Sequence, residues 1–349
     1  EGIHFMKTKL ISLILVFSFV MTLLAGCGAP QTVESPSTPE SSVQSTEITI
    51  TDHAGREVTL EKPAERVVSA YYLSSSLLIA IGAREKVVGI EMKADTRELY
   101  KLAAPEFLEL PAVGSGKGIN VEETAALSPD LVVLPKKLAD SAAQFEALNI
   151  PVIVIDPETL DTFLETVEML GRATGCEEKA DEFISYYKEV MEDVSARTKD
   201  LTDKPTVYLA GSDLLRTAGK GMYQDDLITL CGGVNAAGSI EDSQWVEISA
   251  EQLLSWNPSQ VYLVSYCESS KEDFAAQFGA VDAVKNDAVF TFPSNIEPWD
   301  YPTASSVLGI LWLANALHPD VVTADEVNTA TEEFYQNYFG ISVSVETAA

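Results

Sequence analysis

The sequence predicts an α/β protein of two lobes, each with a central parallel sheet, joined by one long helix. Short Val-rich segments alternate with helical segments in two series, over residues 66–155 and 206–292. One motif, a short helix followed by a buried strand, occurs once in each series. Between the series, residues 177–201 contain neither Gly nor Pro, and a helix of that length spans roughly 35 Å. The two series predict the lobes, and the uninterrupted segment predicts their connection.

The first residues carry an export signal. Lys7 and Lys9 precede an apolar run, residues 10–24, that is too short for a membrane-spanning helix of about 20 residues. The run leads into Leu-Ala-Gly-Cys, the pattern of a lipoprotein signal, in which Cys27 is the lipidated residue. We expect residues 1–26 to be the signal peptide and Cys27 to anchor the chain to the outer face of the cell membrane. An ordinary secretory cleavage with an incidental cysteine is the alternative.

Two further expectations concern the segment up to residue 46. Residues 1–5, before Met6, are interpreted as an upstream remnant. Residues 27–46 are rich in Ser, Thr, Pro, Glu and Gln, a composition that cannot bury enough apolar surface to fold, so we expect a disordered tether.

The charge of the chain limits its partners. Removing residues 1–26 takes two lysines and one glutamate from 23 basic and 53 acidic residues, which leaves a formal net charge of −31. Such acidity argues against nucleic acid and against direct binding to anionic lipid, so the lipid anchor is the expected membrane contact. Three cysteines remain after Cys27, so at most one disulfide is possible, and buried free thiols are an equal expectation.

The first lobe is expected over residues 47–160. It begins with a hairpin and continues with strands that are apolar throughout, as expected for parallel strands covered by helices on both faces. The hairpin strands are residues 48–51 and 58–60, the sheet strands are 66–70, 86–90, 131–135 and 152–155, and a helix over 74–81 is stopped by Gly82.

The connecting region and the second lobe follow. Apolar residues recur at helical spacing over 161–204, interrupted near 171–175, and the interlobe helix is predicted over 177–201, with Pro205 beyond it. The second lobe, residues 205–349, repeats the alternation of strands and helices. Its predicted strands are 206–210, 260–265 and 288–292, and its predicted helices are 223–231, 305–317 and 324–339. Both lobes are therefore expected to be Rossmann-like.

The repeated motif places one carboxylate at the same offset in each lobe. Asn120 and Ser249 are each followed three residues later by Glu or Gln, which predicts a capping box at the start of a short helix. Glu122 and Glu251 then lie in the first helical turn and project from the surface. Each could merely complement its helix dipole, but a matched pair, one per lobe, suits docking onto a two-fold symmetric partner.

Several stretches together resemble the substrate-binding lipoproteins of ABC importers for iron-siderophores, cobalamin and haem, the class III binding proteins. They span nearly the whole chain after residue 50, and their order and spacing carry the resemblance. The matching stretches are Thr51-Asp-His-Ala-Gly-Arg-Glu-Val58, Pro63-Ala-Glu-Arg-Val-Val68, Ile119-Asn-Val-Glu122, Ser128-Pro-Asp-Leu-Val132, Ser249-Ala-Glu-Gln252 and Ser306-Val-Leu-Gly-Ile-Leu-Trp-Leu313.

The resemblance implies partners and a binding site. It implies a monomer whose Glu122 and Glu251 engage arginines of two permease subunits, with an ATPase subunit driving transport. The ligand is expected between the lobes, at the carboxyl ends of the strands. Matching positions that line the site are Tyr71, Tyr72, Met92, Lys117, Lys136, Arg216, Trp245, Trp299, Asp300 and Tyr301. Only one of the two adjacent tyrosines is expected to face ligand, and Arg216 is the strongest candidate for gripping an anion.

The residue types of this set narrow the ligand. Beyond residue 27 the chain has only His53 and His318, which disfavours a free transition-metal ion. Basic and aromatic side chains together favour a bulky anionic chelate such as a ferric siderophore. Cobalamin or another corrinoid, haem, and the oxyanions molybdate and tungstate stay open as alternatives.

An anchored hydrolase is the competing class of function. Neither a Gly-x-Ser-x-Gly elbow nor a His-Glu-x-x-His motif occurs in the chain. We therefore expect a binding protein without catalytic residues and without a cofactor of its own.

Overall fold

The computed structural model describes residues 47–241 and 244–348. The predicted signal peptide, Cys27 and the predicted tether lie outside these residues. Within the described part of the chain, none of the helices is both long and apolar enough to cross a membrane.

The first lobe, β1 to β8, opens with the predicted hairpin of β1 (Ile48–Thr51) and β2 (Glu57–Leu60), which pair antiparallel. Asp52 is 4 % exposed and organises the turn, because its carboxylate accepts hydrogen bonds from the backbone N–H groups of Ala54 and Arg56, both at 3.0 Å. The same carboxylate accepts a bond of 3.0 Å from Val154 N–H. The Thr51-Asp-His-Ala-Gly stretch therefore ties the hairpin to the edge of the main sheet.

That main sheet has six strands in the order β6-β5-β4-β3-β7-β8. All neighbours are parallel except β5 and β6. The bounds are β3 (Val67–Ser69), β4 (Val87–Glu91), β5 (Ala112–Ser115), β6 (Gly118–Ile119), β7 (Leu131–Pro135) and β8 (Val152–Ile155). Successive residues enter opposite cores, with Val67 in one cluster and Val68 in the other. Both faces of the sheet are thus buried, as the apolar strands predict.

Short helices connect these strands. The predicted helix after β3 is α1, and all nine of its residues are buried. The bounds are α1 (Tyr72–Ala80), α2 (Glu98–Ala103), α3 (Val121–Ala126) and α4 (Ala142–Glu146), with 3₁₀ turns η1 (Arg84–Lys86), η2 (Ala94–Thr96), η3 (Pro105–Glu109) and η4 (Lys136–Ser141).

The second lobe, β9 to β14, has a sheet in the order β12-β10-β9-β13-β14, with β11 also pairing β9. β9, β11, β13 and β14 are parallel, whereas β10 and β12 are antiparallel additions that the sequence did not predict. The strands are β9 (Thr206–Ala210), β10 (Arg216–Ala218), β11 (Val234–Asn235), β12 (Trp245–Glu247), β13 (Gln260–Leu263) and β14 (Val289–Thr291); the helices are α7 (Tyr223–Leu230), α8 (Ala250–Trp256), α9 (Lys271–Gln277) and α10 (Asp282–Lys285).

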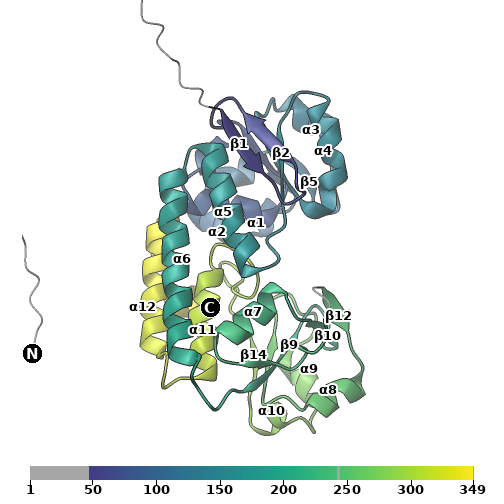
Figure 1. Ribbon diagram of the computed structural model, residues 1–349, viewed down its shortest axis with the longest axis vertical. Helices are drawn as coiled ribbons and strands as arrows, with labels where there is room; N and C mark the ends of the chain where they lie inside the picture. Colours follow the sequence, from purple (N-terminus) through teal and green to yellow (C-terminus); the bar gives the residue numbers. More distant parts are fainter. Residues whose placement is uncertain (1–46, 242–243, 349) are drawn as a thin grey trace, which may run out of the picture. The chain divides into compact units, whose positions relative to one another are not determined.

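The long helix predicted between the lobes is α6 (Glu177–Thr198), preceded by α5 (Leu160–Thr174). α6 ends three residues before the predicted limit. Figure 1 shows α6 running beside α11 (Ser306–Leu317) and α12 (Ala324–Phe334), both of which belong to the closing part of the chain. The chain continues with a π-helical turn, η5 (Tyr335–Phe339), and α13 (Val345–Ala348).

One hydrophobic core is shared by the two lobes. It contains Val67 and Leu131 from the first sheet and Val207 and Tyr262 from the second. The opposite face of each sheet has its own smaller core. The lobes therefore do not close around separate interiors, which limits how far they can move apart. Cys176, Cys231 and Cys267 are free thiols, so no disulfide adds to this packing among the described residues.

Candidate ligand-binding site

The repeated motif has the same local geometry in both lobes. Asn120 Oδ1 accepts from Glu123 N–H at 3.2 Å, and Ser249 Oγ accepts from Gln252 N–H at 3.1 Å. The predicted capping boxes are only half present, because neither residue at the third helical position bonds back to its cap. Each helix is followed by a left-handed residue before proline, Ser128 with φ 51° and Asn257 with φ 45°.

This geometry exposes the two predicted docking carboxylates. Glu122 and Glu251 each occupy the second position of their helix and are exposed. Backbone N–H groups at the start of α8, with the Ser249 hydroxyl, lower the pKa of Glu251. The two carboxylates therefore stand exposed at equivalent places on the two lobes.

A cavity of about 600 Å³ lies at the carboxyl ends of β3, β4, β5, β7 and β8 in the first lobe. This is the edge of the sheet at which the sequence predicted the ligand site. Five predicted residues line it: Tyr71, Tyr72, Met92, Lys117 and Lys136. The other charged lining residues are Glu91, Lys93, Arg97, Lys137, Asp156 and Glu158.

Positive charge gathers at this cavity. Five of the 23 basic residues of the chain line it, against three carboxylates. Burial raises the pKa of Glu91, which accepts hydrogen bonds from Ser75 Oγ and Tyr100 OH. Burial, followed by the neighbouring Asp156, also raises the pKa of Glu158. In a chain with a net charge of −30, the cavity is therefore a local concentration of positive charge.

Arg97 lines the cavity and was missed by the sequence analysis. Its guanidinium carbon lies 3.9 Å from the centroid of the Tyr72 ring. Its Nε atom is buried without a hydrogen-bond partner among the described residues. Its position six residues beyond the end of β4, in the segment that also carries Met92, was the only signal in the sequence.

The second lobe contributes an aromatic row. The Trp245 and Tyr266 rings meet edge-on at 6.3 Å, and the Tyr266 and Tyr301 rings do so at 5.8 Å. Burial, followed by the charge of Asp300, raises the pKa of Tyr266; Arg216 lowers it, and Glu158 of the first lobe raises it further. Tyr266 therefore lies within electrostatic reach of the first-lobe cavity.

Arg216 begins β10, beside this aromatic row. Its side chain is half-buried, and no carboxylate of the described residues lies within ion-pair distance of it. By contrast, Lys136 is paired with Asp156 at 2.5 Å. Arg216 therefore has no carboxylate counter-charge in the described part of the chain, and its contact with an anionic ligand stays a prediction.

The prediction for Trp299 and Asp300 is wrong. Trp299 is fully buried, and its indole N–H donates to Tyr335 OH at 3.4 Å. Asp300 is also fully buried, and its carboxylate accepts from Ser265 N–H at 3.4 Å. Both side chains turn inward from their loop and do not line a binding surface, whereas the next residue, Tyr301, joins the aromatic row.

The burial of Asp300 makes stability depend on pH. Burial raises the pKa of Asp300 to about 6, above its usual value of 3.8, so the folded protein binds this proton more tightly than the unfolded chain. The loss in free energy of unfolding that the charged carboxylate causes is absent below pH 3.8 and fully present above pH 6. We expect Asp300→Asn to be about 2 to 3 kcal/mol more stable than the wild type at pH 8 and to lose this advantage near pH 4. Urea unfolding at both pH values checks this, and an advantage that does not depend on pH would contradict it.

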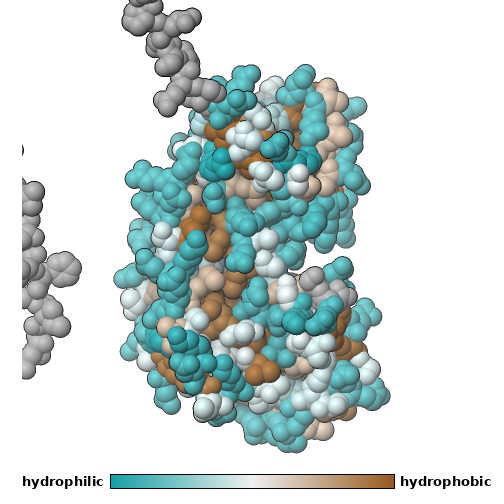
Figure 2. Space-filling model, viewed as in Figure 1, coloured by the Kyte–Doolittle hydropathy of each residue, from teal (hydrophilic) through white to brown (hydrophobic). Residues whose placement is uncertain are grey.

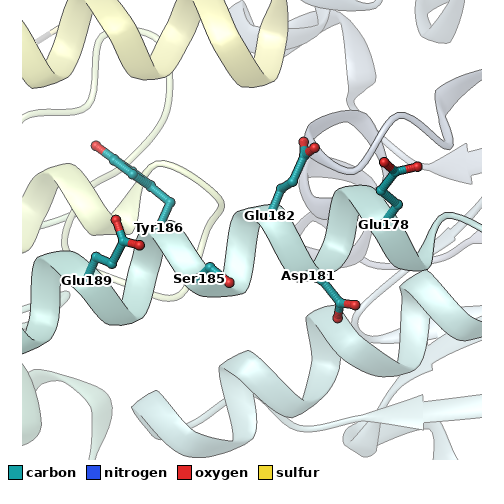
Figure 3. A pocket seen from close by; sticks show the side chains of 6 residues that line it. All are labelled: Glu178, Asp181, Glu182, Ser185, Tyr186 and Glu189. Atoms are coloured by element: carbon teal, nitrogen blue, oxygen red, sulfur yellow. The ribbon is translucent and has the colours of Figure 1, made fainter. Parts of the chain in front are cut away.

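A second hollow, along α6, does not suit the same ligand. It measures about 690 Å³ and is lined by four carboxylates with Ser185 and Tyr186 (Figure 3). The carboxylates are Glu178, Asp181, Glu182 and Glu189. Because no basic side chain lines it, this hollow repels anions.

Comparison with known proteins identifies the family. The model of a family described as "Periplasmic binding protein" matches residues 67–296, about two thirds of the chain. The chain belongs to the periplasmic binding protein family.

Three relatives place the chain within this family. The substrate-binding lipoprotein YvrC of an uncharacterised ABC transporter from Bacillus subtilis is 25% identical over 85% of this chain and 94% of its own length. The molybdate-binding protein MolA of Haemophilus influenzae is 25% identical over 86% and 93%. A vitamin B12-binding protein of Yersinia pestis is 29% identical over 61% and 74%. In the solved structure of MolA bound to molybdate, the fold matches with a TM-score of 0.76 at 22% identity, over 85% of this chain and 99% of that one.

As a periplasmic binding protein, the chain is an extracytoplasmic substrate-binding component of an ABC transporter and not an enzyme. Its parallel-rich sheets and long α6 match the class III fold of the family. Figure 2 shows that the visible face is largely hydrophilic, with hydrophobic patches between the hydrophilic side chains.

Proposed function

We propose that this binding protein captures an anionic metal chelate, a ferric siderophore, between its two lobes and delivers it to the permease of its importer. The observation that carries the proposal is the concentration of five basic side chains around one cavity of a strongly acidic chain. Charge of this kind raises the local concentration of an anion and speeds its capture.

The size and composition of the cavity support a bulky ligand. A volume of about 600 Å³ falls within the range of sites for small organic molecules and cofactors. The row of Trp245, Tyr266 and Tyr301 supplies aromatic surface from the second lobe, which suits the rings of a catecholate. A corrinoid or haem would use the same aromatic surface but would leave most of the basic side chains without a counter-charge.

A compact oxyanion is the second candidate. The relative MolA binds molybdate, and the basic side chains of the cavity suit any anion. A molybdate ion would leave most of the cavity filled with water, so the volume favours the larger chelate.

Delivery follows from the remaining predicted features. Glu122 and Glu251 would dock the loaded monomer onto the two permease subunits, and an ATPase subunit would drive release. Cys27 would tether the protein to the membrane through lipid, and the lipoprotein YvrC is a relative that supports such an anchor.

A ligand panel tests the proposal. The purified protein is titrated with ferric complexes of a tricatecholate and a trihydroxamate, with cyanocobalamin, with haemin and with sodium molybdate, and binding is followed by tryptophan fluorescence and native mass spectrometry. We expect a ferric complex to bind with a Kd of about 1 μM or lower. Binding of cyanocobalamin, haemin or molybdate alone would overturn the choice of ligand, and no binding of any probe would overturn the proposed function.

Replacing Arg216 by Ala is expected to weaken binding of the anionic ligand by about tenfold to a hundredfold, because a charge-assisted hydrogen bond contributes roughly 1.5 to 3 kcal/mol. Titration of the ferric complex measures the change. Lys220→Ala is the matched control, because it removes one charge from the same lobe at an exposed residue paired with Glu241. Equal dissociation constants for both variants would remove Arg216 from the site.

A further inference from the structure

Three side chains, Arg97, Tyr72 and Glu297, contact one another in a row that leads from the cavity into the second lobe. The Arg97 guanidinium lies over one face of the Tyr72 ring, with 3.9 Å between the guanidinium carbon and the ring centroid. The hydroxyl of the same tyrosine donates to Glu297 Oε1 at 3.1 Å. Arg97 and Tyr72 belong to the first lobe, whereas Glu297 lies in the second, between β14 and α11.

Glu297 is held firmly in this position. Its side chain is fully buried. Besides Tyr72 OH, its carboxylate accepts hydrogen bonds from Ser76 Oγ on α1 and from Ser305 N–H at 2.9 Å. Ser76 Oγ in turn accepts from Ala304 N–H at 3.2 Å. This set of bonds joins α1 of the first lobe to the start of α11 in the second.

Tyr72 is consequently a buried and hydrogen-bonded support for this guanidinium. Only 6 % of its surface is exposed, its hydroxyl is bonded to Glu297, and its ring contacts the Tyr100 ring at 5.9 Å. The guanidinium group is planar, and it lies against the face of this ring. An arginine held in this way loses less conformational entropy on binding a ligand than a flexible lysine does.

Arg97 differs from the other cations of the cavity. Its Nε is buried and has no hydrogen-bond partner among the described residues, so a polar group that has already lost water still lacks an acceptor. Lys93, Lys117 and Lys137 are exposed, and Lys136 bonds to Asp156. Arg97 is thus the cation whose environment is prepared for an oxyanion.

We propose that Arg97 contacts the anionic part of the ligand and that Tyr72 and Glu297 are positioning residues that hold it in place. The second lobe then sets the anion affinity of the first-lobe cavity through a carboxylate that does not touch the ligand. This inference rests on the proposed capture of an anion, and it reassigns Tyr72 from ligand contact to support.

The first experiment needs no ligand. Arginine labelled with ¹⁵N is incorporated, and the Arg97 Nε–H resonance is identified by its loss in Arg97→Lys. We expect this resonance to be shifted upfield by the Tyr72 ring and to exchange slowly with water. Tyr72→Phe keeps the ring but removes the bond to Glu297, so the shift should shrink and exchange should become faster. An unchanged resonance in Tyr72→Phe would overturn the positioning role.

The second experiment is a double-mutant cycle with the ferric tricatecholate complex as the probe. We expect Tyr72→Phe to raise its Kd by about three- to tenfold in the wild-type background and to have no effect once Arg97→Ala is present. Tyr208→Phe is the matched control, because it removes a buried tyrosine bond, to Leu214 O at 2.9 Å, in the second lobe and should leave Kd unchanged.

The outcomes separate this inference from the proposed function. An equal effect of Tyr72→Phe with and without Arg97 would show that the tyrosine acts only on folding and would overturn the inference. If no probe of the panel binds, the proposed function fails, and the arginine resonance alone decides whether Tyr72 and Glu297 position Arg97. Both measurements are repeated with Glu297→Gln, which changes the residue that holds the Tyr72 hydroxyl. We expect it to act in the same direction as Tyr72→Phe.

Discussion

Reversing the charge of both Glu122 and Glu251 to Lys is expected to reduce uptake of the ligand by about 100-fold or more while leaving its Kd unchanged. Both carboxylates are exposed at the start of short helices, away from the lining of the cavity. If they face arginines on two permease subunits, the reversal replaces two attractions by two repulsions, each costing several kcal/mol. Uptake of ⁵⁵Fe-labelled chelate into cells with the cognate permease measures the first quantity, and fluorescence titration measures the second.

The neighbouring positions provide the control. Glu123 and Gln252 are exposed at the third position of the same two helices, so their replacement by Lys puts the same unfavourable charge near each helix N-terminus. We expect this pair of changes to retain most of the uptake. A weaker ligand Kd in the Glu122→Lys, Glu251→Lys protein would assign these residues to the binding site or to the fold instead.

Adding one methyl group at Gly309 is expected to destabilise the protein by about 3 kcal/mol. Gly309 lies within α11, where a Cβ would collide with the backbone oxygen of Trp299 and lie 3.0 Å from its carbonyl carbon. Backbone atoms cannot move aside as the end of a flexible side chain can, so the helix or the loop carrying Glu297 would have to shift. Gly309→Ala should lower the midpoint of thermal unfolding by about 5 °C.

Gly118→Ala is the control for this change. A Cβ at Gly118 meets no heavy atom within 4 Å, so the same substitution adds a methyl group in open space. We expect its unfolding midpoint to lie within about 2 °C of the wild type. Equal losses for the two variants would show that the contact between α11 and the loop is not the cause.

Most of the fold could be predicted because its strands are apolar along their whole length. β7 and β8 are fully buried, and their predicted bounds match the structure. β6, β10 and β12 have only two or three residues and no continuous apolar run, so these antiparallel strands could not be predicted from the sequence. The end of α6 was predicted too late, because no residue of 199–204 is a Gly or Pro that would stop a helix.

The place of the candidate site could be predicted from the sheet topology, but the direction of individual side chains could not. Loops after parallel strands meet at one edge of a sheet, and this rule selected Tyr71, Met92 and Lys136 correctly as lining residues. It cannot say which way a loop side chain turns. Trp299 therefore seemed as good a candidate as its neighbour Tyr301, although its indole packs inside the protein.

The core shared by both lobes has a practical consequence for measuring ligand binding. All four tryptophans of the chain lie between residues 245 and 312, in the second lobe. Because the interior of that lobe is continuous with that of the first, loss of either half should disrupt the other, and melting should be a single cooperative event. Tryptophan emission from the second lobe then reports thermal unfolding of both lobes. It should also report a rise in the unfolding midpoint caused by a small molecule that binds mainly to the first lobe.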